Sequence, residues 1–191
     1  MELKKILEKR RSIYNIGNDL PISEDEVTTL VKDLTELVPD AFDMKSARVI
    51  ILFNEKHHFF WDTVFNIFDG KISREKIESF KSGAGTILYF YDKNVVQVLQ
   101  EKFPLYAQNF PIWANQANGM LQFTIWSGLA EKGIGANLQH YNPVIDKKIK
   151  EIFNIPESYE FVAQMPFGNI KLEALSKAKE NIDTRVIVIK N

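Results

Sequence analysis

Residues 113–132 read WANQANGMLQFTIWSGLAEK and predict a long helix that is apolar on most of its faces. Its large apolar side chains are Met120, Leu121, Phe123, Ile125, Trp126 and Leu129. A helix on the surface of a protein normally keeps a clean polar face, which this segment lacks. We therefore expect the helix to lie at the centre of the fold, with Gly133-Ile134-Gly135 ending it.

Apolar runs on either side of this helix predict the strands of a sheet. Residues 49–53 (VIILF) and 86–91 (TILYFY) are almost continuously apolar, which is typical of strands covered on both faces. Residues 159–165 predict another strand, and residues 184–189 (TRVIVI) predict a last β-rich segment.

Helical spacing and end signals predict the remaining elements. Ser23 and Glu26 form a capping box, and Pro39 ends the helix that follows. Helices are expected at residues 3–11, 23–38 and 56–68, from residue 73 onward, and at residues 142–154. The order of helices and apolar strands predicts an α+β or α/β domain with four or five strands.

Composition excludes several classes of function. The chain has 191 residues and no repeat or linker, so we expect a single domain over residues 1–191. The formal charge of −1 gives no overall reason to bind nucleic acid or an anionic membrane. No signal peptide or long uncharged apolar window is present, so we expect a cytoplasmic protein.

The absence of cysteine excludes disulfides, thiolate nucleophiles, Cys-ligated zinc and iron–sulfur clusters. Any redox activity therefore needs a bound organic cofactor. Neither Gly83-Ala84-Gly85 nor Gly133-Ile134-Gly135 completes a dinucleotide-binding fingerprint, because leucine stands at the sixth position of each. His57 and His58 are adjacent and cannot share a metal, so we expect no metal site and a solvated helix face there.

Three further features leave alternatives open. Arg10-Arg11-Ser12 suits a phosphate monoester, but cations at a helix C-terminus are also stabilised without a ligand. Arg185 stands alone and reads as a surface charge, and His140 follows an extended piece where polar side chains commonly face a site. The many aromatic residues of the middle of the chain fit a core, a pocket for a flat ligand or a dimer interface.

Several motifs together resemble the FMN-dependent nitroreductase family, in particular its short branch with the yeast fatty-acid-repression protein and bacterial stress-induced nitroreductases. The matching segments are RRSIY (10–14), GAGTILYF (83–90), KFPLYA (102–107), QANGMLQ (116–122), GANLQHYNP (135–143) and AQMPFG (163–168). The resemblance spans nearly the whole chain. It implies an α+β fold with a central mixed sheet flanked by helices, and an intertwined homodimer with FMN at its interface.

The resemblance also implies which residues hold FMN. Arg10, Arg11 and Ser12 would bind its phosphate and ribityl chain, together with the C-terminal Arg185. Tyr14 belongs to the same group, although Tyr14 and Asp183 stand where many nitroreductases carry a basic residue.

Two other segments would lie beside the flavin ring. Gln116 and the loop of Gln139, His140 and Tyr141 would approach it, with backbone amides facing the N5 edge. The partner subunit would contribute a loop at residues 39–45, through Pro39, Ala41, Phe42, Asp43 and Lys45. This loop departs from the family pattern, because Asp43 replaces an amide and Lys45 replaces a neutral glutamine.

The implied activity is an FMN oxidoreductase that takes two electrons from NAD(P)H and passes them to a nitroaromatic or quinone by ping-pong kinetics. No side chain is expected to be catalytic, because the cofactor carries the chemistry. The alternatives are a flavin-binding stress-response or regulatory protein with incidental reductase activity, and a dimeric interaction module that has lost its flavin.

Overall fold

A five-stranded sheet forms the centre of the computed structural model, which describes residues 2–178 and 180–190. The strands pair in the order β1–β5–β3–β2, and β4 pairs with β5. Their bounds are Ile16–Gly17 (β1), Ala47–Phe53 (β2), Gly85–Asp92 (β3), Ile134–Ala136 (β4) and Tyr159–Ile170 (β5). The α+β class and the strands predicted at residues 49–53, 86–91 and 159–165 are confirmed.

The ladders between these strands are antiparallel. Leu88 at the middle of β3 lies opposite Ile50 of β2 on one side and Gln164 of β5 on the other. Within the described residues the parallel pairing is a single isolated bridge between Ser12 and Ala136. The expectation of a mixed sheet is therefore wrong for the strands of one chain. The β-rich segment predicted at residues 184–189 adds no parallel strand, because it forms no strand in this chain.

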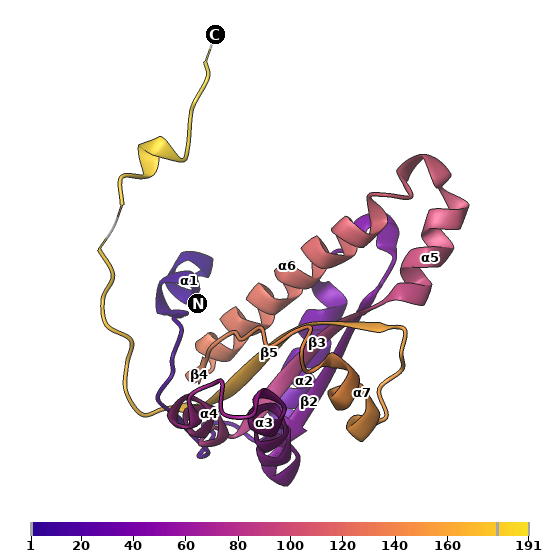
Figure 1. Cartoon of the computed structure of the whole chain (residues 1–191). Coiled ribbons are helices and arrows are strands. Elements are labelled where there is room, and N and C mark those ends of the chain that lie inside the picture. Colours follow the sequence, from indigo (N-terminus) through magenta and orange to yellow (C-terminus); the bar gives the residue numbers. More distant parts are fainter. Residues whose placement is uncertain (1, 179, 191) are drawn as a thin grey trace.

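That remaining segment is the C-terminal tail, residues 171–190 apart from the undescribed residue 179. It leaves the body of the protein and runs away from it in an extended path, interrupted by the short turn η3 (Ile182–Thr184) (Figure 1). Val186, Ile187, Val188 and Ile189 expose 58–91% of their surface. The strand predicted at residues 184–189 is absent because no sheet edge of the same chain lies beside the tail to supply hydrogen bonds.

Helices cover the sheet and confirm most of the predicted boundaries. The bounds are Leu3–Lys9 (α1), Glu24–Leu37 (α2), Asn54–Phe68 (α3), Arg74–Lys81 (α4), Lys93–Lys102 (α5), Phe110–Glu131 (α6) and Asp146–Phe153 (α7). The capping box of α2 forms as predicted, with the Glu26 N–H donating to Ser23 Oγ and the Ser23 N–H donating to Glu26 Oε2. α5 was not predicted, because its apolar stripe is short and its start depends on Asp92 accepting from the Asn94 N–H.

The two faces of the sheet pack against different helices (Figure 1). On β3, Ile87 and Tyr89 belong to the core shared with α2 and α6, whereas Leu88 and Phe90 belong to the core shared with α3, α4 and α7. This alternation is the two-residue period of a strand, and it explains why β3 reads as a continuous apolar run. The central position predicted for the apolar helix is confirmed, because α6 buries Leu121, Ile125 and Leu129.

The edge strand β2 differs from its prediction as a fully covered strand. Val49 and Ile51 are only half-buried, because β2 ends the sheet order and pairs with β3 alone in the described chain. α6 also keeps an exposed apolar stripe, since Ile112, Met120 and Phe123 expose 55, 47 and 45% of their surface. No helix of the described residues is long and apolar enough to cross a membrane.

Candidate functional site

The segment Arg10-Arg11-Ser12 leaves the end of α1 and joins the sheet at once. The Arg10 N–H caps the helix by donating to the Ile6 carbonyl over 2.8 Å. Ser12 forms its bridge with Ala136 of β4, and the Ile13 N–H donates to the Ala136 carbonyl over 3.0 Å. The backbone of this segment is therefore held in place while the side chains of two arginines project from it.

The Arg10 guanidinium lies over aromatic rings of α6. Its Cζ is 4.3 Å from the ring centroid of Trp126 and 5.6 Å from that of Phe123. Burial, followed by the neighbouring charge of Arg11, lowers the pKa of Arg10. The Arg10 Nε–H is buried and finds no hydrogen-bond partner among the described residues. Because an unpaired buried donor costs about 1–3 kcal/mol, this position favours an anionic acceptor such as a phosphate.

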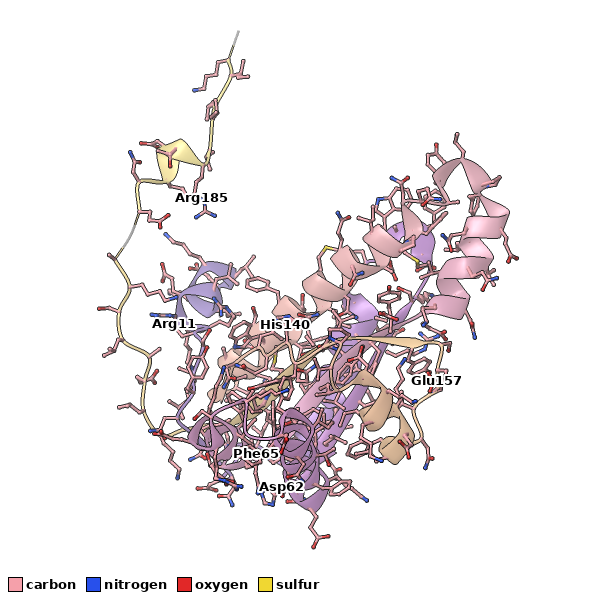
Figure 2. The ribbon with its side chains drawn as sticks, viewed as in Figure 1. Arg11, Asp62, Phe65, His140, Glu157 and Arg185 are labelled. Atoms are coloured by element: carbon pink, nitrogen blue, oxygen red, sulfur yellow. The ribbon has the colours of Figure 1, made fainter. Side chains whose placement is uncertain are left out.

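The structure does not bring Arg185, which was also predicted to bind the phosphate, close to Arg10 and Arg11. Arg11 donates from Nη2 to the Leu175 carbonyl of the tail over 2.7 Å. Arg185 is exposed, further along the tail, and Figure 2 shows it away from both Arg11 and His140. Tyr14 follows the segment and exposes 52% of its surface. One chain therefore assembles Arg10, Arg11 and Ser12, but leaves Arg185 apart from them.

The loop after β4 lies beside this segment and is held by buried amide side chains. Asn137 Nδ2 donates to the Ile13 carbonyl over 2.8 Å, and Gln139 Nε2 donates to Asn137 Oδ1 over 2.8 Å. Gln139 also pairs with Gln164 of β5 through both backbone groups. The predicted residue Gln139 is thus a buried part of the scaffold, whereas the neighbouring His140 is exposed.

Tyr141 serves the core as much as the loop. Its ring packs edge-on against Trp61 and Phe68 of α3, with centroid distances of 5.8 and 5.5 Å, and burial raises its pKa. Its backbone N–H donates to Gln164 Oε1 over 2.9 Å. Of the two loop amides expected to face a flavin, the Tyr141 amide is therefore already used inside the protein.

The loop at residues 39–45 has a strained backbone. Phe42, Asp43 and Lys45 have φ angles of 56, 51 and 52°, a left-handed conformation that side-chain-bearing residues seldom adopt. The carboxylate of Asp40 holds the end of the loop by accepting from the Ser46 N–H and Oγ–H. Strain of this kind gathers at functional sites, where the surrounding structure maintains it.

Phe42 anchors the loop in a cluster of aromatic rings. Its ring stacks on Trp113 of α6 at 5.8 Å and contacts Phe103, Tyr106 and Phe110 at 4.9, 6.0 and 5.2 Å. Beyond it, Lys45 Nζ lies 3.4 Å from Asp43 Oδ2, so the two residues that depart from the family pattern form an exposed ion pair. Gln116 lies one turn further along α6, exposed, between Ile112 and Met120 on the exposed apolar stripe.

A groove of about 960 Å³ runs between α2 and β2 and ends at this loop. Its walls include Val31 of α2, Val49 and Ile51 of β2, and Leu121 of α6, and Lys45 lies at its end. The groove is therefore mostly apolar and opens beside the unpaired edge of the sheet.

His57 corrects a sequence prediction. It does not lie on a solvated face but is fully buried, with Nδ1 2.7 Å from Thr86 Oγ1 and Nε2 3.2 Å from the Lys81 carbonyl. Burial is the main cause that lowers its pKa to about 4. Trp61 Nε1 donates to the same Thr86 hydroxyl. The contact between His57 and Thr86 is therefore part of the hydrogen bonding of the core. Of the adjacent pair, only His58 is exposed, and the described residues contain no group of His, Asp and Glu that could hold a metal.

The motifs did not indicate the buried amides Asn137 and Gln164 or the half-buried Asn142 as parts of the site. Gln164 is fully buried and binds both Tyr141 and Asn142. Gln164 within the apolar run at residues 161–165 was the available signal, because a buried amide needs hydrogen-bond partners.

Comparisons with known proteins agree on one family. The family model described as "Nitroreductase family" matches residues 7–169. The putative nitroreductase HBN1 of Saccharomyces cerevisiae is 33% identical over 167 residues, which cover 86% of each chain. Nitroreductase CinD from Lactococcus lactis, solved in complex with chloramphenicol, is 39% identical with a TM-score of 0.94, over 99% of this chain and 100% of that chain. A putative nitroreductase from Exiguobacterium sibiricum in complex with FMN shares the fold at 15% identity, with a TM-score of 0.77 over 99% of this chain and 98% of that chain.

Proposed function

This chain belongs to the nitroreductase family, and from that premise we propose that it is an FMN-dependent oxidoreductase that carries two electrons from NAD(P)H to nitroaromatic or quinone acceptors. CinD, which is similar over the whole chain, was solved with chloramphenicol and with 4-nitrophenol. The more distant relative solved with FMN supports the choice of cofactor. The cytoplasmic location stays a prediction from the sequence.

The observation that carries the proposal is the donor set at the end of α1. Arg10, Arg11 and Ser12 follow one another on a backbone held by β4, and the buried Arg10 Nε–H lacks a partner among the described residues. These residues fit the phosphate of FMN, since charge-assisted hydrogen bonds from guanidinium groups are strong and directional. When bound, FMN supplies the redox chemistry, by accepting two electrons from the nicotinamide and giving them to the acceptor.

The protein's own residues position and shield the cofactor. The loop of Gln139, His140 and Tyr141 lies next to the arginine segment (Arg10-Arg11-Ser12) through Asn137, so the two segments can hold the two ends of one FMN molecule. Gln116 and the exposed apolar stripe of α6 would exclude water from the ring. No side chain is assigned a covalent step.

A second copy of the chain completes the proposed site. The exposed tail residues 186–189 are β-branched and apolar, and the groove beside the edge strand β2 has matching apolar walls. We propose that the tail of each copy lies in the groove of the other and pairs with β2 as an added strand. Such a homodimer would bring Arg185 and the loop at residues 39–45 of the partner toward the arginine segment.

The ion pair of Asp43 and Lys45 is proposed to tune the flavin. Lys45 offsets the charge of Asp43 at 3.4 Å and would place a cation near the ring. Lys45→Gln should lower the midpoint potential by about 10–20 mV, the effect of an exposed charge on a two-electron couple. Spectroelectrochemical titration of the bound flavin measures this shift, with Lys56→Gln on α3 as the control. An unchanged potential in Lys45→Gln contradicts the assignment.

The overall proposal is tested with the purified protein. We expect a yellow protein whose absorbance near the flavin bands bleaches with NADH or NADPH and returns on adding a nitroaromatic or quinone. Initial rates over both substrates should give parallel double-reciprocal lines, because nicotinamide and acceptor would use one site in turn. A colourless protein that FMN does not reconstitute overturns the proposal.

A further inference from the structure

We propose that the buried side chains of Asn137, Gln139 and Gln164 and the half-buried side chain of Asn142, together the amide ladder, set the spacing between the phosphate end and the ring end of the cofactor site. The inference rests on the proposed FMN site. It adds a positioning role for Gln164, Asn137 and Asn142, which are not among the predicted contact residues but hydrogen-bond to them or to their neighbours.

The first end of the ladder holds the arginine segment. Asn137 Nδ2 donates to the Ile13 carbonyl over 2.8 Å, and the Ile13 N–H donates to the Ala136 carbonyl over 3.0 Å. Ile13 follows Ser12 directly, and Ser12 itself forms a bridge with Ala136. The position of the proposed phosphate ligands is thus tied to the loop through Asn137.

The second end holds the ring-facing loop. Gln164 Oε1 accepts from the Tyr141 N–H over 2.9 Å, and Gln164 Nε2 donates to Asn142 Oδ1 over 2.7 Å. Asn142 Nδ2 in turn donates to the Phe161 carbonyl and to Asp146 Oδ1 over 2.9 and 3.0 Å. The loop is therefore fastened to β5 on both sides of Tyr141.

Gln139 joins the two ends. Its Nε2 donates to Asn137 Oδ1 over 2.8 Å, and its backbone exchanges hydrogen bonds of 2.7 and 2.9 Å with the backbone of Gln164. A continuous set of hydrogen bonds thus runs from the Ile13 carbonyl to the Tyr141 N–H. Asn137 and Gln164 each use both the donor and the acceptor of their side-chain amide, whereas Gln139 uses its Nε2 donor and its backbone.

Burial gives the ladder its rigidity. Asn137 and Gln164 are fully buried and Gln139 is 7% exposed, so none of these groups can exchange its partner for bulk water. A fully satisfied buried network specifies one arrangement, because every alternative leaves a polar group unpaired. A ligand that binds at two ends gains most when the spacing is already correct, since it then does not have to order the site.

The inference is tested by comparing FMN with riboflavin, which lacks the phosphate. In the wild type, the ratio of the riboflavin dissociation constant to that of FMN measures how much the phosphate adds to the binding affinity when the ring is also bound. Gln164→Met keeps the volume of the side chain but removes both hydrogen bonds, so the spacing is no longer held. We expect this ratio to fall about tenfold, through weaker FMN binding and little change for riboflavin. Flavin fluorescence titration of the apoprotein measures both constants.

The matched control is Gln122→Met. Gln122 is 6% exposed and donates from Nε2 to Asn118 Oδ1 over 2.7 Å, so the variant loses a comparable buried hydrogen bond from α6, outside the ladder. Its ratio should stay within about twofold of the wild type, even if its melting temperature falls. A ratio that changes equally in both variants, or in neither, overturns the inference.

A second variant covers the case in which Gln164→Met does not fold. Gln164→Glu keeps the acceptor for the Tyr141 N–H and loses the donor to Asn142, which the new carboxyl regains when it is protonated. We expect a reduced ratio at pH 8 and recovery toward the wild-type ratio at pH 5.5, whereas a purely structural role predicts no recovery. If the wild type itself binds neither flavin, the proposed function fails. If the wild type binds both flavins and the ratio is the same in the Gln164 variants as in the wild type, only the inference about the amide ladder fails.

Discussion

Arg10 combines contacts that a surface arginine seldom has together. It stacks on Trp126, its pKa is lowered by burial, and its Nε–H has no partner in the described chain. An arginine that served only to cap α1 would not need this environment, because the macrodipole acts on an exposed cation as well. From the sequence alone, Arg10 could equally bind a phosphate or only stabilise the end of α1. The contacts favour phosphate binding.

We expect Arg10→Ala to weaken FMN binding about 10- to 100-fold and riboflavin binding much less, because a charge-assisted pair with the phosphate is lost. Equilibrium titration of the apoprotein with each flavin measures both effects. Arg74→Ala is the matched control, since the Arg74 Cζ lies 4.2 Å from the ring centroid of Phe65 on α3, in a similar stack outside the site. Equal losses for FMN and riboflavin would argue that Arg10 only supports the fold.

His57 makes the stability of the protein depend on acidity. Its pKa is about 4 in the fold against about 6.5 when unfolded, so the folded state prefers the neutral ring. The contribution is complete above about pH 6.5 and is lost as the pH falls toward 4, to a total of about 3 kcal/mol. Urea unfolding at pH 7 and pH 4.5 should show a smaller pH dependence for His57→Gln than for the wild type. His58→Gln, at the exposed neighbour, should behave like the wild type, and equal pH dependence in all three proteins contradicts the assignment.

The loop at residues 39–45 is the element in which backbone strain and side-chain packing oppose each other. η1 (Ala41–Asp43) holds left-handed residues in place because the Phe42 ring is fixed among the rings of α6 and of η2 (Pro104–Tyr106). Phe42, which anchors the loop, is therefore at most three residues away from each loop residue proposed to face the partner's flavin.

Removing the Phe42 ring should separate the effect of backbone strain on stability from that of side-chain packing. Phe42→Ala is expected to lose about 1–2 kcal/mol of stability, because it gives up aromatic contacts and keeps the strained φ of 56°. Phe42→Gly should be about 1 kcal/mol more stable than Phe42→Ala, because glycine adopts this φ without a steric cost. Urea unfolding measures both, and Phe59→Ala on α3, where the side chain is also 49% exposed, is the control. An alanine variant as stable as the glycine variant would exclude backbone strain.

At the scale of the whole molecule, one chain leaves complementary apolar surfaces uncovered. The tail exposes its β-branched residues, and the edge strand β2 borders an apolar groove of about 960 Å³. The exposed stripe of α6, with Met120 and Phe123, adds a third surface on the helix predicted to be central. Part of the 45% hydrophobic content therefore lies on the surface of the single chain and not in its core.

We expect truncation after Arg185 to weaken the homodimer at least about tenfold, because it removes the apolar tail segment while it keeps the proposed phosphate ligand. Sedimentation velocity over a dilution series measures the dissociation constant. Leu105→Ser, which removes an 84% exposed apolar side chain elsewhere, should leave that constant unchanged. A wild-type protein that sediments as a monomer at all concentrations would contradict the proposed assembly.

Local patterns determined much of this protein. The capping box at Ser23, the apolar strands β2, β3 and β5, and the central helix α6 follow from side-chain period and end signals, which act over a few residues. The cysteine-free composition limited redox chemistry to an organic cofactor, and the motifs indicated the family before the fold was known.

The tertiary structure decided what depends on contacts between distant segments. It buried His57, engaged the Tyr141 amide with Gln164, and left residues 184–189 without the strand that their β propensity favours. It also joined Ile13 to Asn137 and Tyr141 to Gln164 across long stretches of sequence. Propensity describes one residue and its neighbours, whereas burial and hydrogen-bond satisfaction depend on which segments the fold brings together, so only the folded chain could settle them.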